Sequence, residues 1–382
     1  MKILLVNHLL DPVSGGGTAE RTFQLARFLA EEGVDCTVLA LDIGIGPERR
    51  IKLGQARLIT VPCVNDRFFI PQISFAKLSE LVANADIVHL SGHWTLFNAL
   101  IFRACRQLGK PYLFCPAGAL KPFGRSLWLK RLYDFLVGRK LTRSATACIA
   151  ITEAERADFL ACGVPDERVV VIPNGIDPDA YRLDDPLTAI AEFRQSVGVG
   201  NARFILFLGR LNLIKGPDLL LDAFCQLDQS FADVHLVMAG PDGGMLRELK
   251  EAVSARGLAG RVHFPGYVGG LQKVVALHAA TLLAIPSRRE AMSIVVLEGG
   301  VCACPVLFTD ACGLDDLARE GAGTMVQVSA VALAESLTTM LRNPERSRAS
   351  ACHLNAIIRR HFFWGVQAQR YLSLSQQVVG RV

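Results

Sequence analysis

Short apolar runs alternate with amphipathic stretches from the first residues to about residue 172. The runs are rich in Val, Ile and Leu, which is typical of parallel strands buried on both faces of a sheet. Between the first two runs, Thr18–Glu31 places apolar side chains at spacings of three and four and predicts a helix. The predicted strands are Ile3–Val6, Val34–Leu41, Ile87–Leu90, Tyr112–Cys115, Ala147–Ile151 and Val169–Ile172.

The alternation stops at Pro173–Pro178, where two prolines, a glycine and an Asn/Asp pair disfavour helix and strand alike. It then restarts, so a chain of 382 residues is expected to form two α/β domains, residues 1–176 and 177–360. A lone helix pattern in the tail, residues 361–382, is expected to pack across the junction. The second set of predicted strands is Phe204–Leu208, Val234–Ala239, Val262–Phe264, Leu282–Pro286, Val306–Thr309 and Met325–Val328, with helices at Pro217–Leu227, Leu246–Arg256, Val331–Leu341 and Trp364–Val379.

Composition narrows the class of protein. The net charge of +5 is too mild and too dispersed for a general nucleic-acid binder. Although 51% of the residues are hydrophobic, no segment reaches the roughly 18 uninterrupted apolar residues of a membrane helix. The eleven cysteines lack framework spacing and the first apolar run is too short for a signal peptide, so we expect reduced thiols and a cytoplasmic protein.

Two carboxylates, Glu290 and Glu298, stand eight residues apart after a predicted buried strand. A nucleotide-sugar carries hydroxyl groups on its hexose and on its ribose, with the diphosphate between them. Glu290 could therefore hold the sugar and Glu298 the ribose, while a helix start at Ser293 and Ile294 offers backbone N–H groups to the diphosphate. Taken alone, the spacing equally fits an amphipathic helix with two solvated carboxylates.

A second cluster changes that balance. Gly209 and Arg210 end a predicted strand, and Lys215 stands just before the next predicted helix. A glycine, two cations and a helix start at the carboxyl end of a strand form an anion site, where Arg and Lys could neutralise a diphosphate. Without the neighbouring carboxylate motif, we would interpret this cluster as an ordinary basic loop.

A glycine run, Gly15, Gly16 and Gly17, precedes the first predicted helix and would let the backbone approach a ligand closely. The G-x-G-x-x-G fingerprint of dinucleotide-binding folds is absent. A flexible turn explains the run equally well.

Together these motifs resemble the large family of retaining glycosyltransferases with the GT-B fold, many of which build bacterial surface polysaccharides. The resemblance spans nearly the whole chain and is strongest from Phe204 to Gly313. It implies two facing Rossmann-like domains, an N-terminal acceptor domain and a C-terminal donor domain, with a final helix that returns to the first. By this resemblance Arg210 and Lys215 bind the diphosphate of a GDP- or UDP-sugar, Glu290 contacts the transferred sugar and Glu298 the ribose.

The resemblance also implies further contacts. Backbone groups near Gly240, Tyr267 and Val268 are expected to read the base. Ala291–Ser293, including Met292, stands where the family commonly has Gly-Phe-Gly and narrows the space near the sugar. The remaining contacts expected from the first domain are Gly16 and Gly17 on the donor side, and Gly15, His89, Ser91 and His93 on the acceptor side.

One departure concerns the first domain. The family commonly has His-x-His after the fourth or fifth strand, whereas here the run is His89-Leu90-Ser91-Gly92-His93. Either His93 replaces the missing second histidine as a catalytic residue, or His89 is a histidine satisfied at a strand end.

The segment 121–143 is basic and interleaved with apolar residues, against the single acid Asp134. Such a segment suits an anionic membrane surface. If the acceptor is lipid-linked, this surface would be the inner face of the cytoplasmic membrane. The alternative is an ordinary helix that buries its apolar face and solvates its charges. Its cations are Lys121, Arg125, Lys130, Arg131, Arg139, Lys140 and Arg143, and its apolar residues include Phe123, Trp128 and Phe135.

Asp177-Pro178-Asp179 matches a metal-binding Asp-x-Asp pattern but lies in the breaker-rich junction, so no metal and no other cofactor is expected. Three other functions stay open. They are a nucleotide-sugar epimerase of the same architecture, an NAD-dependent oxidoreductase, which the absent fingerprint disfavours, and a non-catalytic sugar- or lipid-binding scaffold.

Overall fold

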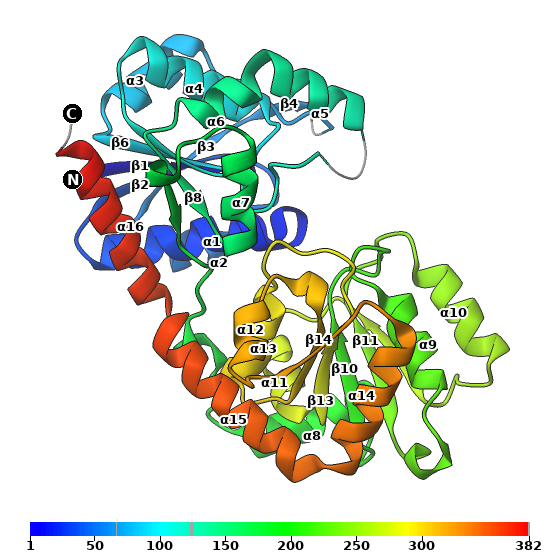
Figure 1. Cartoon of the computed structure of the whole chain (residues 1–382). Coiled ribbons are helices and arrows are strands. Elements are labelled where there is room, and N and C mark those ends of the chain that lie inside the picture. The colour runs from blue at the N-terminus through cyan, green and yellow to red at the C-terminus, as the bar shows by residue number, and fades with distance from the viewer. Residues whose placement is uncertain (66, 123–125, 381–382) are drawn as a thin grey trace. The chain divides into compact units, whose positions relative to one another are not determined.

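A computed structural model describes residues 1–65, 67–122 and 126–380. The chain forms two compact units (Figure 1). The first comprises Met1–Gly175 together with the C-terminal segment from Trp364, and the second comprises Ile176–Phe363. The roles of acceptor and donor domain stay predictions.

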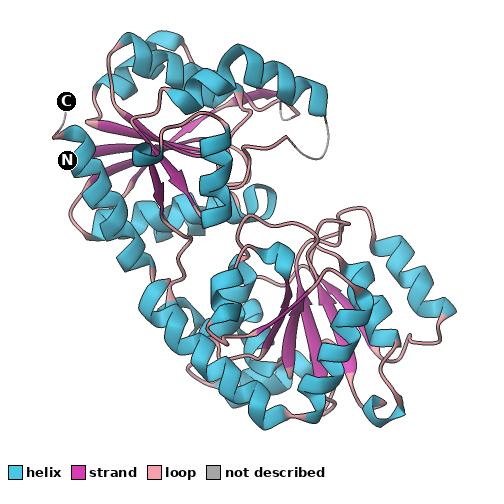
Figure 2. Ribbon diagram, in the orientation of Figure 1, coloured by secondary structure: helices cyan, strands magenta, loops and turns pink. Residues whose placement is uncertain are grey.

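The first unit is built on a parallel sheet in the order β3-β2-β1-β6-β7-β8-β9. Helices cover both faces of this sheet (Figure 2), as expected where strands are apolar throughout. The order reverses between β1 and β6, so ligands are expected outside the carboxyl ends of these two strands. The strands are β1 (Lys2–Val6), β2 (Asp35–Leu41), β3 (Arg57–Val61), β6 (Ile87–Ser91), β7 (Tyr112–Cys115), β8 (Ala147–Ala150) and β9 (Val169–Val171), beside a small hairpin of β4 (Cys63–Asn65) and β5 (Ile70–Pro71).

The C-terminal helix α16 (Trp364–Val379) belongs to the first unit, which confirms the expected return of the chain. Arg21 donates a hydrogen bond to the Tyr371 hydroxyl, and the Arg370 guanidinium donates one of 2.6 Å to the Val171 carbonyl. The other helices of this unit are α1 (Pro12–Glu31), α2 (Pro47–Lys52), α3 (Phe75–Ala83), α4 (Leu96–Gln107), α5 (Leu127–Tyr133), the π-helical η1 (Asp134–Gly138), α6 (Arg139–Arg143), α7 (Glu153–Ala161) and the 3₁₀ turn η2 (Asp166–Arg168).

The second unit repeats this design with a parallel sheet in the order β12-β11-β10-β13-β14-β15. Its switch point lies between β10 and β13. The strands are β10 (Phe204–Leu208), β11 (His235–Ala239), β12 (Val262–Gly266), β13 (Leu282–Ile285), β14 (Val306–Thr309) and β15 (Thr324–Val326). The helices are η3 (Pro178–Tyr181), α8 (Pro186–Ser196), α9 (Pro217–Cys225), η4 (Gln229–Phe231), α10 (Leu246–Ala255), α11 (Gly270–Ala279), α12 (Ile294–Val301), η5 (Asp310–Cys312), α13 (Asp315–Arg319), α14 (Ala330–Arg342) and α15 (Pro344–His361).

The two passages of the chain between the units run side by side. Ile176 and Phe363 form an isolated parallel bridge, in which the Ile176 N–H lies 2.6 Å from the Phe362 carbonyl oxygen. Gly175 packs so tightly on Trp364 that a Cβ there would lie 2.6 Å from the indole ring. The units therefore divide at 175/176 and 363/364, close to the breaker-rich segment Pro173–Pro178.

Candidate functional site

The expected donor-site residues of the second unit gather at one edge of its sheet. Because all its strands are parallel, their carboxyl ends share an edge. Ligands of such sheets commonly bind at this edge, where the strand order reverses. The residues that follow these strands are Gly209, Arg210 and Lys215 after β10, Gly240 after β11, Tyr267 and Val268 after β12, and Glu290, Met292, Ser293, Ile294 and Glu298 after β13.

The loop after β10 is a compact turn. The Asn212 side chain accepts a hydrogen bond of 3.0 Å from the Lys215 N–H, a short-range bond typical of Asn in turns. Gly216 ends the loop with φ of +68°, and a Cβ there would lie 2.1 Å from the Pro286 carbonyl oxygen. Glycine at 216 thus lets this loop meet the segment after β13.

Glu290 lies in that segment and its carboxylate has three polar neighbours. The Lys215 ammonium lies 2.7 Å away, and the hydroxyls of Ser287 and Ser293 donate hydrogen bonds of 2.5 and 3.3 Å. The carboxylate is only 10% exposed. The structure therefore joins the two sequence motifs in one pair, with Lys215 from the first and Glu290 from the second.

Arg288 ties the same two segments together, a role that the sequence did not reveal. Its guanidinium donates to both carboxylate oxygens of Asp218, at 2.8 and 2.5 Å, and to the Leu213 carbonyl at 2.8 Å. Burial alone would raise the pKa of Asp218, but the hydrogen bonds and charge of Arg288 hold that pKa below its usual value. Arg288 therefore fixes the loop that carries Lys215.

The start of α12 differs in one detail from the expectation. The Ser293 N–H donates to the Cys312 carbonyl at 2.9 Å, so it is not a free donor for a diphosphate. The Ser293 side chain makes no cap hydrogen bond, so it does not satisfy the first-turn N–H groups of α12, which starts at Ile294. The N–H groups expected to face a diphosphate therefore begin at Ile294, where α12 starts.

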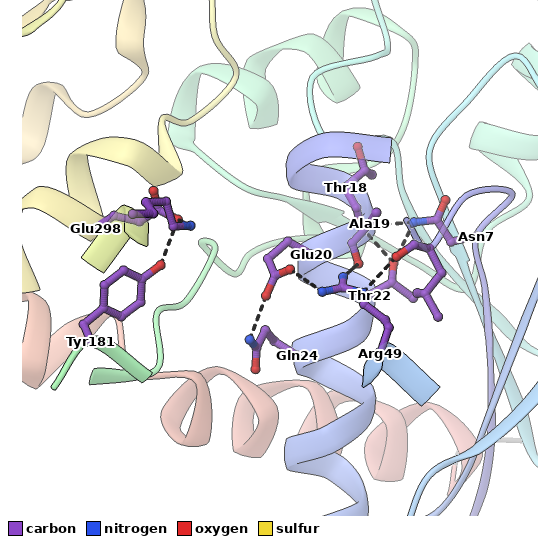
Figure 3. A network of polar contacts seen from close by, with 11 residues as sticks. Asn7, Thr18, Ala19, Glu20, Thr22, Gln24, Arg49, Tyr181 and Glu298 are labelled. Atoms are coloured by element: carbon purple, nitrogen blue, oxygen red, sulfur yellow. Dashed lines mark hydrogen bonds and ion pairs between the residues drawn. The ribbon is translucent and has the colours of Figure 1, made fainter. Parts of the chain in front are cut away.

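Glu298 is 6% exposed and already has partners on one oxygen (Figure 3). Oε1 accepts a hydrogen bond of 2.8 Å from the Tyr181 hydroxyl and one of 2.6 Å from the Lys273 ammonium. Neither partner was visible in the sequence, because Tyr181 and Lys273 stand 117 and 25 residues away from Glu298. Oε1 of Glu298 thus already accepts two hydrogen bonds within the second unit.

The remaining donor-side residues differ in exposure. Tyr267 is 55% exposed, whereas Val268 and Met292 are buried. Gly240 lies against the loop after β10, where a Cβ would be 1.8 Å from the Gly209 carbonyl oxygen. Only glycine at 240 permits this approach of the two loops.

In the first unit the glycine run lies inside α1 instead of before it. Gly16 breaks the helix with φ of 56° and ψ of −142°. The buried Asn7, directly after β1, donates from its amide to the Thr18 carbonyl at 3.0 Å and to the Thr22 hydroxyl at 2.9 Å (Figure 3). Asn7 thereby holds the part of α1 that follows the break.

Arg49 of α2 braces α1 from outside, another contact that sequence reasoning missed. Its guanidinium lies 2.8 Å from the Glu20 carboxylate (Figure 3), 3.0 Å from the Leu10 carbonyl oxygen and 3.9 Å from the centre of the Phe23 ring. The turn after β1 is therefore held on both sides, by Asn7 and by Arg49.

His89 packs against the C-terminal helix. Its ring is buried, and Nε2 lies 3.0 Å from the Ser375 hydroxyl of α16. Burial, with a smaller effect from the charge of Arg21, lowers the pKa of His89 to about 3. The C-terminal helix covers this ring, and an acceptor contact of His89 stays a prediction. Its neighbour Ser91 ends β6 and is partly exposed.

His93 follows β6, but its side chain is also buried. Nε2 lies 2.9 Å from Asp134 Oδ1, and the same oxygen accepts a hydrogen bond of 2.9 Å from the Trp94 indole. Its ring packs against Phe114 and Tyr133. His93 thus anchors η1, and a direct contact with the donor sugar does not follow from this placement.

Within the described ranges, no group of three or more His, Cys, Asp or Glu side chains could hold a metal ion. Asp177, from the Asp-x-Asp pattern, caps η3 by accepting from the Asp179 N–H. In the same ranges, no helix combines the length and the hydrophobicity needed to cross a bilayer.

Comparison with known proteins agrees with this architecture. The chain is 30% identical over 261 residues to a D-inositol 3-phosphate glycosyltransferase of Kineococcus radiotolerans, a match that covers 63% of this chain and 59% of that protein. The crystal structure of Anabaena HepE in complex with UDP-glucose aligns with a TM-score of 0.81 at 22% identity over 98% of this chain and 100% of HepE. WaaG, a glycosyltransferase involved in lipopolysaccharide biosynthesis, aligns with a TM-score of 0.71 at 20% identity over 99% of this chain and 100% of WaaG.

Two family models match the two halves of the chain. The model of Glycosyltransferase Family 4 matches residues 15–180, and that of Glycosyl transferases group 1 matches residues 189–353. With the paired Rossmann-like units, these matches show that the chain belongs to the group 1, family 4-like glycosyltransferases of the GT-B fold.

Proposed function

We propose that this protein transfers a hexose from a nucleoside-diphosphate sugar to a glycan or lipid-linked acceptor, with retention at the anomeric carbon. The observation that carries the proposal is the meeting of Lys215 and Glu290 at the switch point of the second unit. A cation for a leaving diphosphate and a carboxylate for a sugar stand within one hydrogen-bond distance there. A pure binding protein has no need of a clamp for a leaving group.

In the proposed reaction the bond between the anomeric carbon and the diphosphate oxygen breaks. The acceptor oxygen forms the new bond on the same face of the sugar, and its proton passes to the departing diphosphate. Arg210, Lys215 and the amides at the start of α12 stabilise the negative charge that develops on the diphosphate. Glu290 stabilises the positive charge on the sugar. Lys215 and Arg210 take the role that a metal ion plays in other enzymes, so no cofactor is needed.

The choice of donor and acceptor draws on similar proteins. HepE binds UDP-glucose, which makes UDP-sugars the first donors to test and GDP-sugars the second. WaaG acts in lipopolysaccharide biosynthesis, and we propose a role in bacterial surface polysaccharide synthesis for this chain also. The Kineococcus relative is named for D-inositol 3-phosphate, so we add phosphorylated inositol to the acceptors to test. The matched part spans 59% of the length of that relative.

We also propose peripheral contact with the inner face of the cytoplasmic membrane through the stripe Leu127–Arg143. Exposed side chains recur along it at a spacing of four, and Trp128 and Phe135 are 68% and 75% exposed. Its one acid, Asp134, is turned inward to His93 and Trp94, so the exposed stripe is apolar and basic. Such a surface suits anionic lipid. Phe123 and Arg125 of the expected segment lie outside the described residues.

The test is a turnover assay with a panel of UDP- and GDP-hexoses in the presence of EDTA. Release of the diphosphate that depends on an added acceptor, with the product in the donor's anomeric configuration, supports the proposal. Incorporation of solvent deuterium at the sugar C2 without acceptor would instead indicate an epimerase. Tight binding of a nucleotide-sugar without turnover for any acceptor would favour the scaffold.

A further inference from the structure

The Glu298 carboxylate stands at a junction of three elements of the second unit. Glu298 comes from α12, Lys273 from α11, and Tyr181 from the end of η3. The Tyr181 hydroxyl donates to Oε1 at 2.8 Å (Figure 3). The Lys273 ammonium donates to the same oxygen at 2.6 Å. One oxygen of the carboxylate therefore carries both contacts.

Tyr181 is itself fixed by α11. His278 Nε2 lies 3.0 Å from the Tyr181 carbonyl oxygen, and the Lys273 ammonium lies 5.6 Å from the centre of the Tyr181 ring. Because a carbonyl only accepts, His278 is the donor of this bond. Lys273 and Tyr181 therefore contact each other as well as Glu298.

These contacts constrain how Glu298 can bind anything else. The Lys273 and Glu298 side chains are 29% and 8% exposed, so the ion pair is screened less by water than a surface pair. Two donors on Oε1 fix the plane of the carboxylate. Side chains of a helix lean toward its start, which for α12 is the carboxyl edge of the sheet where the donor-site loops gather. In the proposed arrangement Oε2 accepts hydrogen bonds from hydroxyl groups at that edge.

We propose that Lys273 and Tyr181 are positioning residues that hold Glu298 in the orientation that binds the ribose hydroxyls of the donor. The inference rests on the proposed ribose contact of Glu298. A purely structural role is the rival: the three residues would then only pin η3 and α11 to α12. The two roles differ in one respect, since positioning acts on the ribose hydroxyls alone.

The experiment compares UDP with 2′,3′-dideoxy-UDP by calorimetry, and GDP with its dideoxy form in the same way. In the wild type the ribose form is expected to bind at least tenfold more tightly. Lys273→Met should lose most of this preference, weakening UDP about tenfold while changing dideoxy-UDP less than twofold. Lys273→Arg should restore the preference, because the guanidinium can also donate to Oε1. Tyr181→Phe should give a smaller loss of the same kind.

Lys250→Met is the matched control, because Lys250 is an exposed lysine of α10 far from Glu298 in the chain. It should leave both affinities unchanged. Tyr181→Phe, which removes one oxygen only, keeps the inference testable if Lys273→Met does not fold.

Three results would overturn the inference, and they are distinguishable. If Glu298→Gln abolishes the ribose preference but Lys273→Met and Tyr181→Phe keep it, the positioning role is wrong while the ribose contact stands. If Glu298→Gln keeps the preference, the ribose contact fails and the positioning role fails with it. If the wild type binds neither nucleotide, the proposed function itself is wrong.

Discussion

The Lys215 ammonium lies 2.7 Å from the Glu290 carboxylate, although the two residues stand 75 positions apart in the chain. Lys215 comes from the loop after β10 and Glu290 from the segment after β13, the two strands on either side of the switch point. A diphosphate is a stronger partner for an ammonium than one carboxylate, because it carries more charge. We therefore expect the donor to draw Lys215 to the diphosphate and leave Glu290 to the sugar.

Glu290→Gln separates these two roles. The amide keeps the shape of the side chain but cannot stabilise positive charge on the sugar, so kcat should fall about 100-fold. Affinity for UDP or GDP alone should stay within about threefold, since a free nucleotide presents no sugar to Glu290. Steady-state kinetics and calorimetry on the same samples check this. A parallel loss of nucleotide affinity and kcat would place Glu290 on the diphosphate instead.

Arg288→Ala should loosen the loop that carries Lys215. The variant loses the paired hydrogen bonds to Asp218 and the bond to the Leu213 carbonyl. Because both side chains are about 30% exposed, we expect a modest loss of about 1–2 kcal/mol, together with weaker nucleotide binding. Urea unfolding and calorimetry measure the two effects, with the exposed Arg247→Ala as the control. Unchanged nucleotide binding in Arg288→Ala would show that Arg288 does not position the loop.

The proposed membrane surface predicts a loss of lipid binding on truncation of its aromatic residues. Trp128→Ala combined with Phe135→Ala should weaken binding to phosphatidylglycerol vesicles about tenfold, because these two aromatic side chains have the largest exposed fractions among the large apolar residues of the stripe. Co-sedimentation measures this, with Leu187→Ala, an 82% exposed leucine of α8, as the control. Equal binding to pure phosphatidylcholine would argue against the role of the basic residues, and no vesicle binding by the wild type would contradict the surface itself.

The buried imidazole of His89 is expected to lower the free energy of unfolding in acid. Burial lowers the pKa of His89 to about 3 in the folded protein, whereas in the unfolded chain the imidazole takes up a proton near the ordinary histidine pKa of 6.5. The unfolded state thus binds more protons below this pH. The contribution of neutral His89 to the free energy of unfolding is therefore fully present above about pH 6.5 and is lost as the pH falls. One such group costs about 1.4 kcal/mol per pH unit in that window. The buried His8, whose pKa burial lowers to about 4, adds to the slope.

Unfolding by urea between pH 7 and pH 4 checks this prediction. His89→Gln removes the titrating group and should flatten the pH dependence, even if the variant is less stable at neutral pH. An unchanged slope in His89→Gln would mean that other groups cause the acid sensitivity.

Most strands were predictable because they are apolar throughout. Phe204–Leu208 and Val306–Thr309 match β10 and β14 residue for residue. The edge strand β3, Arg57–Val61, was missed because it is half exposed and mixes Arg57 and Thr60 with apolar residues. The helix α15 was missed for a similar reason, since its buried residues, among them Leu354 and Ile358, are diluted by six basic positions.

The motifs of the proposed donor site were visible in the sequence, but the residues that contact them were not. Residue type and local spacing singled out Arg210, Lys215, Glu290 and Glu298. The pairing of Glu298 with Tyr181 depends on how η3 meets α12, which no local pattern reports. One feature of the sequence hints at the pairing of His93 with Asp134. Asp134 is the single acid of the basic segment 121–143, which suggests a specific partner for it.

The carboxyl edge of the second sheet is proposed to bind a nucleoside diphosphate through side-chain cations. Calorimetry with UDP, GDP, ADP and CMP, without added metal and again with EDTA, measures this binding. We expect one diphosphate to bind with micromolar affinity regardless of EDTA, and binding to fall at least tenfold in Arg210→Ala and in Lys215→Ala. If the folded wild-type protein binds none of these nucleotides, or binds one only when a metal is added, the proposed site is wrong.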